Sequence, residues 1–293
     1  MNSKSEKKYE IILASVIAAR ASSFLFCKLL LSHLGKFNLV ALRFLIAFLM
    51  LSVIFRKSLL HISKKSFLSG VIIGVLFFAT ITCELTALTQ ADSALVSLLE
   101  NCSIIFVPLF SIAIDRRLPD RITCASVLIA MTGVLFLALS QNGLSGGFLF
   151  ALLAAVCYAL AIIVTAKLSR ECDDTLAVGI IQVGTIGVLA LAVSLISGPF
   201  TFPSSSTEWL MLFILIVVCT VFGFTLQPVA QSHVSADRAG LFCAISPAIA
   251  CLLGVIVLHE KFTSLSFLGL VLILLSILLP YIMNIRAKRK NSE

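Results

Sequence analysis

Apolar segments of about 20 residues recur from one end of this chain to the other, separated by short polar segments. A helix needs roughly 20 apolar residues to cross the hydrocarbon core of a bilayer. The chain is also 60% hydrophobic and only 12% charged, unlike a soluble globular domain. These features predict an all-α integral membrane protein with ten transmembrane helices. The expected spans are residues 10–31, 37–55, 66–88, 92–114, 121–139, 146–166, 175–197, 208–230, 237–258 and 263–284.

The segments between these spans are short, and the longest covers residues 197–208. They leave no room for a separate soluble domain, so the function is expected within the helix bundle. The first span is not expected to be a cleaved signal peptide, because it is too long and contains Arg20 and Lys28.

The chain has a net charge of +8, and its basic residues are distributed unevenly between the two sides of the membrane. If the amino terminus is cytoplasmic, most Lys and Arg residues fall in cytoplasmic segments, whereas the opposite loops contain only Lys36 and Lys261. This asymmetry predicts a multi-pass protein of the cytoplasmic (inner) membrane with both termini cytoplasmic. The basic tail "RAKRK" is interpreted as an anchor that can touch anionic lipid, and no nucleic-acid partner is expected.

The nine cysteines lie mostly within the spans and form no CxxC or Cys/His metal-binding pattern. We interpret them as packing residues and expect no metal site, disulfide or cofactor.

An internal repeat appears when residue n is placed beside residue n + 144. Residues 91–119 then align with residues 235–263, and in both a span rich in small residues ends in a short charged turn before a last apolar helix. The predicted domains are therefore a first five-helix repeat at 1–140 and a second at 141–293, which includes the tail. Because five is odd, the second repeat would enter the membrane from the opposite side, as in many secondary transporters.

Several stretches carry a family resemblance: "ALRFLIAFLML" at 41–51, "ALTQADSALVSLL" at 87–99, residues 106–139, and residues 239–279 with Pro247 and then His259-Glu260-Lys261. With them the chain resembles the drug/metabolite transporter superfamily, and within it the EamA-type ten-helix transporters. The resemblance implies transport of a small metabolite. Many such transporters export amino acids and others take up metabolites such as S-adenosylmethionine, so the substrate stays open.

Five ionisable side chains fall inside the expected spans, and all five belong to the first repeat: Arg20, Lys28, Arg43, Glu84 and Glu100. A charge within a bilayer is costly and marks a functional site unless it is paired. Arg20 lies about 13 Å into its span, at 1.5 Å per residue. Lys28 is nearer the membrane surface, where it is equally well explained as an anchor.

Glu100 shares one helix face with Ser93, Ser97 and Ser103. We expect this face to look inward onto a polar cavity, with Arg20 or Arg43 as the counter-charge of Glu100. The alternative is a fixed ion pair that specifies helix packing. The residues predicted to contact substrate are Arg20, Arg43, Glu84, Ser97, Glu100, Asn101, Tyr158, Gln182 and Gln227.

The second repeat contributes uncharged polar groups, including Tyr158, Gln182, Gln227 and Ser246 beside Pro247. Tyr158 needs a partner for its hydroxyl when buried, although an aromatic side chain in a bundle is more often a packing residue.

The leading interpretation is a secondary transporter that moves an amino acid or a related zwitterionic or anionic solute by alternating access. The chain contains no phosphate-binding loop, so ATP is not the expected driving force, and protons are the candidate coupling ion. A channel or a translocator of lipophilic compounds is the alternative. An intramembrane enzyme is not favoured, because HExxH and related catalytic patterns are absent. A monomer and a homodimer are both compatible with the sequence.

Overall fold

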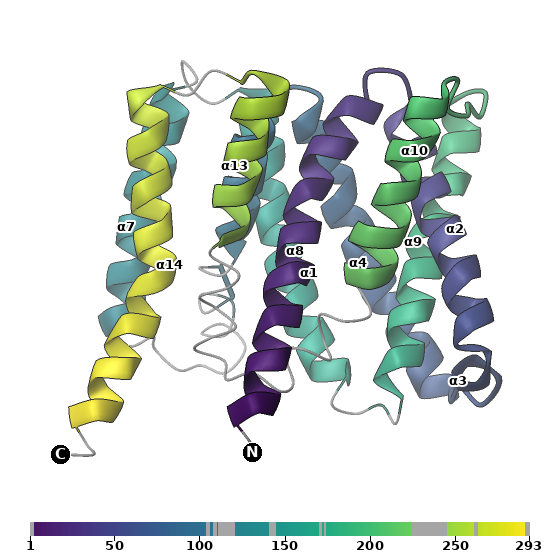
Figure 1. Cartoon of the computed structure of the whole chain (residues 1–293), viewed down its shortest axis with the longest axis horizontal. Helices are drawn as coiled ribbons and strands as arrows, with labels where there is room; N and C mark the ends of the chain where they lie inside the picture. Colours follow the sequence, from purple (N-terminus) through teal and green to yellow (C-terminus); the bar gives the residue numbers. More distant parts are fainter. Residues whose placement is uncertain are drawn as a thin grey trace.

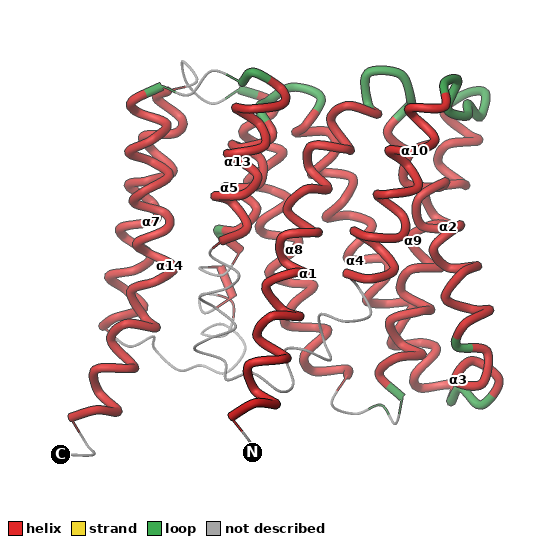
Figure 2. Tube along the Cα trace, viewed as in Figure 1, coloured by secondary structure: helices red, strands yellow, loops and turns green. Residues whose placement is uncertain are grey.

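The computed structural model describes residues 3–103, 106–107, 110, 121–140, 145–169, 172, 174–223, 245–260 and 263–290. Their helices lie side by side in one bundle, and no strand occurs within these ranges (Figures 1 and 2). The all-helical fold predicted from the apolar periodicity is therefore confirmed for this part of the chain.

The helices of the first half are α1 (Ser3–Leu30), α2 (Lys36–Ile54), the short α3 (Arg56–Leu60), α4 (Lys64–Leu88), α5 (Ser93–Asn101) and α7 (Arg121–Ser140). Those of the second half are α8 (Gly146–Ser169), α9 (Thr175–Ser197), α10 (Ser206–Ile214), the π-helix η1 (Leu215–Phe222), α13 (Ile245–Leu258) and α14 (Ser264–Lys290). Each expected span overlaps one or more of these helices.

Side chains in the polar segments start several helices. Ser63 accepts a hydrogen bond from the amide of Ser66, Asp174 from the amides of Leu176 and Ala177, and Ser205 from the amide of Glu208. Such caps satisfy amide groups that have no partner within the helix. The polar breaks in the sequence thus set where α4, α9 and α10 begin.

Within the described residues, five helices are long and apolar enough to cross a membrane, and these segments are Ile11–Leu30, Lys36–Ile54, Lys64–Leu88, Gly146–Thr165 and Thr175–Ser197. Many large apolar side chains on the outside of the bundle are exposed, for example Ile196 at 86% and Val53 at 75%. Such a surface suits a lipid environment and not water. The total of ten spans and the cytoplasmic position of the termini stay predictions.

Both chain ends emerge at the same end of the bundle, which we call the terminal end (Figure 1). The loops that follow α1, α4, α9 and α13 lie at the opposite end, which we call the distal end.

The contacts between helices follow a pattern of exchange. By their order in the two halves, α1 corresponds to α8, α2 to α9, α4 to η1 and α5 to α13. The contact of α4 with α8 then corresponds to the contact of η1 with α1, and both contacts occur. Likewise α4 with α9 becomes η1 with α2, and α1 with α13 becomes α8 with α5, and all four occur. Two repeats related by a twofold axis would produce this pattern.

Glycines let α9 approach its two neighbours closely. A Cβ atom on Gly74 of α4 would lie 2.6 Å from Cβ of Thr185, and one on Gly187 of α9 would lie 2.9 Å from the backbone nitrogen of Leu45. Small residues at such crossings allow backbone-to-backbone packing of membrane helices.

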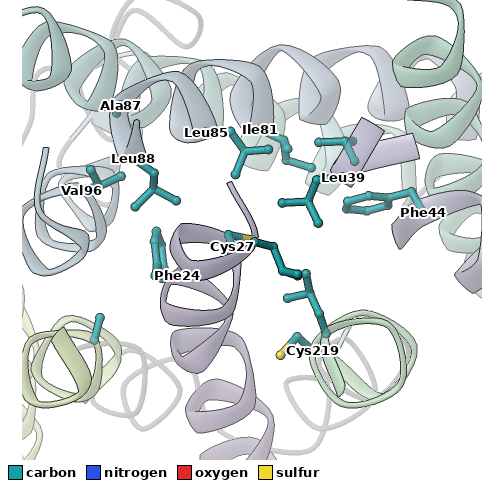
Figure 3. Packing of buried hydrophobic residues seen from close by; sticks show 14 of the residues in the cluster. Phe24, Cys27, Leu39, Phe44, Ile81, Leu85, Ala87, Leu88, Val96 and Cys219 are labelled. Carbon is teal, nitrogen blue, oxygen red and sulfur yellow. The ribbon is translucent and has the colours of Figure 1, made fainter. Parts of the chain in front are cut away.

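The apolar core on one side of the bundle joins α1, α2, α4, α5 and η1. Phe24 and Cys27 of α1 lie between Leu88 of α4 on one side and Phe44 and Cys219 on the other (Figure 3). This core borders the polar site described next.

Candidate functional site

A cavity of about 90 Å³ lies inside the bundle. Since one water takes up about 30 Å³ in the liquid, this volume has room for a few waters or a small solute. The residues that line it are Ile17, Arg20, Ser23, Phe24, Arg43, Phe44, Phe77, Thr80, Ile81, Glu84, Glu100, Asn101, Tyr158 and Ser246. They come from α1, α2, α4 and α5 of the first half and from α8 and α13 of the second.

Arg43 is held in place by neighbours on two other helices. Its Nε donates a hydrogen bond to Oγ1 of Thr220, 2.7 Å away, and its Nη1 lies 3.6 Å from Sγ of Cys27. The guanidinium also lies over the ring of Phe44, 5.0 Å from the ring centroid. Arg43 is buried, with 8% of its surface exposed, and these contacts fix the orientation of its guanidinium.

Thr220 owes its position to the π-helix. Its hydroxyl donates to the carbonyl of Leu215, five residues earlier, at 3.0 Å, and the same oxygen accepts from Arg43. Local π-helices are rare and often occur at functional sites. Here the wider turn of η1 places a hydroxyl against the arginine of α2.

Arg20 of α1 passes close to the end of η1. A Cβ atom on Gly223 would lie 3.1 Å from Cγ of Arg20, so this glycine leaves room for the arginine stem. The residue is half-buried and its side chain reaches the cavity wall.

The two glutamates of the cavity are buried, with exposures of 9% for Glu84 and 8% for Glu100. Glu84 lies within electrostatic reach of Arg43 and Arg20, and Glu100 within reach of Glu84 and Arg20. Oε2 of Glu100 is buried without a hydrogen-bond partner among the described residues. The direct ion pair expected for Glu100 with Arg20 or Arg43 is therefore not formed at this oxygen.

Two uncharged groups are fixed by local contacts. Asn101 donates from Nδ2 to the carbonyl of Ser97 at 2.7 Å, within its own helix. The ring of Tyr158 meets the ring of Phe77 edge-on, with 5.8 Å between centroids. Tyr158 is thus both a packing residue and part of the cavity wall.

Six of the predicted residues line this cavity: Arg20, Arg43, Glu84, Glu100, Asn101 and Tyr158. Ser97 is fully buried, but its hydroxyl has no partner in the described part of the chain and does not line the cavity. Gln182 belongs to the contact of α9 with α4, where its backbone carbonyl lies beside Gly74. Gln227 lies outside the described residues.

The serine stripe on α5 is inward, as expected, since Ser93, Ser97, Glu100 and Ser103 are all buried. Only Glu100 of this stripe reaches the cavity, however. A common helix face predicts burial, but which part of the interior is hollow depends on how the neighbouring helices pack.

Lys28 is absent from the cavity lining and pairs instead at the distal end, with Oε1 of Glu260 at 2.9 Å. With Lys28 included, the three basic and two acidic side chains of the expected spans would make the cavity basic by one charge. Without it, two arginines and two glutamates formally balance.

Glu260 binds the start of α5. Its Oε1 accepts from the amide of Ser93 at 2.7 Å, and its Oε2 accepts from the hydroxyl of Ser93 at 3.0 Å and the amide of Ala94 at 3.3 Å. Burial raises the pKa of this carboxyl, but the bonds from Ser93 and Lys28 outweigh it and hold the pKa below its ordinary value of 4.5. We call Lys28, Ser93, Ala94 and Glu260 the distal cluster.

Sequence reasoning missed Thr220 as a site residue and noted Glu260 only as part of a charged turn. Thr220 sits in the apolar run "LIVVCTVF", where one hydroxyl carries little signal. The partners of both residues are more than 150 positions away, so no local pattern could reveal them.

Known proteins resemble this chain over most of its length. Two proteins of Archaeoglobus fulgidus, each described as an uncharacterized transporter, are 26% identical over 280 residues and 24% identical over 273 residues. The first match covers 89% of this chain and 91% of the relative, and the second covers 91% and 83%.

A solved crystal structure matches the fold with a TM-score of 0.68 at 17% identity, covering 94% of this chain and 98% of that chain. The sequence itself matches the EamA-like transporter family twice, over residues 8–139 and over residues 145–282. These two matches leave out only the chain ends and residues 140–144. The chain therefore belongs to the EamA-like transporter family of membrane transporters.

Proposed function

We propose that this protein is a secondary transporter that moves a small zwitterionic or anionic metabolite, with amino acids as the first candidates, across the cytoplasmic membrane by alternating access. The observation that carries the proposal is the buried cavity in which Arg20, Arg43, Glu84 and Glu100 meet. Transporter families of this kind place their substrate near the middle of the membrane between two repeats.

The exchange pattern of helix contacts supports two inverted repeats, residues 1–140 and 141–293, as the moving halves. The cavity draws residues from both, because Tyr158 and Ser246 face the four charged residues of the first half. A rocking motion of one half against the other would open such a site first to one side and then to the other.

The size and charge of the cavity support the substrate class. A cavity of about 90 Å³ is small beside the roughly 300–1,000 Å³ of pockets that take drug-sized ligands, which favours a small solute such as an amino acid. Arg43 and Arg20 offer donors for a carboxylate, while Glu84 and Glu100 offer acceptors for an ammonium group. The formal balance of charges favours a zwitterion over a cation.

Protons are the proposed coupling ion, with Glu100 as their carrier. Its Oε2 atom is buried and accepts no hydrogen bond from the described residues, so a proton or the ammonium group of a zwitterionic substrate would satisfy it.

A screen by thermal unfolding tests the proposal. Purified protein is heated with each of a panel of amino acids, nucleosides and their conjugates, and a ligand of the folded state raises the melting temperature. The hits are then assayed for counterflow in proteoliposomes. We expect saturable uptake that is accelerated by the same solute on the opposite side.

Two outcomes would contradict the proposal. Flux that rises without saturation would indicate a channel, and stabilisation by lipophilic compounds alone would indicate a translocator of such compounds. A cationic substrate would contradict the proposed class but not the transporter function.

A further inference from the structure

The distal cluster ties the two halves of the chain together. Lys28 and Ser93 belong to α1 and α5 of the first half, whereas Glu260 follows α13 of the second half. The carboxylate of Glu260 receives four hydrogen bonds from the first half, two on each oxygen. Its side chain is only 4% exposed.

The backbone around Glu260 is shaped for this contact. His259 has a φ of 54°, a left-handed conformation that turns the chain back after α13, and the amide of Glu260 then donates to the carbonyl of Gly254 at 3.1 Å. A Cβ atom on Gly254 would lie 2.4 Å from Oε2 of Glu260 and 2.9 Å from Oγ of Ser93. Gly254 therefore makes room for the carboxylate between α13 and α5.

Lys28 adds a second link. Its Nζ donates to Oε1 of Glu260 at 2.9 Å and to the carbonyl of Ala91 at 2.8 Å, and it lies 3.7 Å from Oδ1 of Asp92. One ammonium group thus joins α1, the loop before α5 and the segment after α13.

We propose that the distal cluster is the gate that closes the cavity toward the distal end, with the Glu260 carboxylate as the group that must leave the start of α5 for that end to open. The proposal rests on the transport function proposed above. It assigns a role in the transport cycle to Lys28, Ser93, Ala94 and Glu260.

The position of the cluster supports a gate. α13 packs against both α1 and α5, and these three helices contribute Ser246, Arg20 and Glu100 to the cavity. Along α5, Ser93 of the distal cluster comes about two helical turns before Glu100 of the cavity. The cluster therefore lies between the cavity and the distal end. Opening the distal end requires α13 to part from α1 and α5.

The chemistry of the cluster supports reversible opening. Hydrogen bonds to ionised groups are strong when water is excluded, yet water replaces them when the groups become solvated. The Lys28 side chain is already 25% exposed and Asp92 38%, so water is near. A purely apolar plug would gain nothing from water entry and would resist opening.

Accessibility of a cysteine placed below the cluster tests the gate without knowledge of the substrate. Ser23→Cys is introduced into the full chain with its native cysteines replaced by alanine or serine, and a membrane-impermeant methanethiosulfonate reagent is added to each face of the membrane in turn. Ser23 lines the cavity between Arg20 and Lys28 of α1 and is only 8% exposed, so its labelling from the distal face requires opening at that end.

Glu260→Gln keeps the shape of the side chain and removes its charge. We expect it to raise the labelling rate of Ser23→Cys from the distal face by about tenfold or more, as the loss of charge-assisted bonds shifts the equilibrium toward the open state. The matched control is Glu208→Gln, since Glu208 lies at the same end but interacts with Ser204 and His33 outside the cluster. We expect the control to label at the parent rate.

An unchanged labelling rate in a folded Glu260→Gln variant would overturn the gate and leave the cluster a fixed helix cap. If that variant does not fold, Lys28→Met gives the decision, because it keeps the apolar stem and removes the other charge. Its control is Lys36→Met, since Lys36 bonds Thr86 at the same end. If the labelling rate does not change but substrate still binds, the gate alone is rejected. If the labelling rate rises as expected but none of the tested solutes binds, the proposed substrate class is rejected.

Discussion

Arg43 of α2 and Thr220 of η1, 177 positions apart in the sequence, are joined by a hydrogen bond of 2.7 Å from Nε to Oγ1. This bond connects the first half of the chain to the second at the cavity wall. It makes the orientation of a buried guanidinium depend on a single hydroxyl.

Thr220→Val keeps the shape of the side chain and removes the acceptor of Arg43. A buried charged donor that loses its partner costs about 1–3 kcal/mol, so we expect substrate affinity to fall by about tenfold. Thr220→Ser retains the hydroxyl and should bind nearly as wild type. Isothermal titration with the best ligand of the thermal screen measures both, and equal affinities for the two variants would remove Thr220 from the site.

Glu100→Gln is expected to keep the fold and lose transport. The substitution preserves side-chain volume but removes the carboxylate whose Oε2 lacks a partner among the described residues. We expect a transport rate reduced about tenfold or more, with a melting temperature near that of wild type. Ser97→Ala, on the same face but outside the cavity, is the control. Wild-type transport by Glu100→Gln would make Glu100 a packing residue, and loss of expression would favour a structural role.

Arg20→Ala is expected to abolish substrate binding. The guanidinium of Arg20 stays positively charged at physiological pH and lines the cavity from α1, where it can bind an anionic group of the substrate. The loss also removes a positive charge near Glu100, so Arg20→Ala combined with Glu100→Ala should regain stability without regaining transport. Binding assays and thermal unfolding check the two effects. Arg56→Ala, at an exposed arginine of α3, controls for the substitution itself, and an Arg20→Ala affinity within about twofold of wild type would contradict the role.

Gly187→Ala should destabilise the contact of α9 with α2. Its Cβ atom would lie 2.9 Å from the backbone nitrogen of Leu45, and overpacking of this kind costs about 1–3 kcal/mol. Gly179→Ala in the same helix meets nothing within 4 Å and should be neutral or slightly stabilising. Thermal unfolding in the same detergent compares them, and equal melting temperatures would show that the α9 crossing tolerates a methyl group.

The orientation of the chain is tested with single cysteines at the two ends of the bundle. Ser205 is exposed beside the start of α10 at the distal end, and Lys65 is exposed at the start of α4 at the terminal end. With cytoplasmic termini, an impermeant maleimide added to intact cells should label Ser205→Cys and spare Lys65→Cys. The reverse result would invert the topology.

The amino-acid sequence alone was enough for the class of protein and much of the site composition. Runs of about 20 apolar residues predict membrane helices because the bilayer imposes one length on every span. The cost of burying charge singles out Arg20, Arg43, Glu84 and Glu100, because each residue type carries that cost wherever its partners lie. All four line the cavity.

Tertiary structure decided which polar groups meet. Lys28 was equally well explained by the sequence as an anchor, yet it pairs with Glu260, and Ser97 and Gln182 were predicted site residues that pack elsewhere. Thr220 gained its role only because a π-turn directs it at a helix from the other half. Depth along a span follows from counting residues, but the choice of partner depends on how helices rotate and cross. That choice is made by packing between segments far apart in the chain.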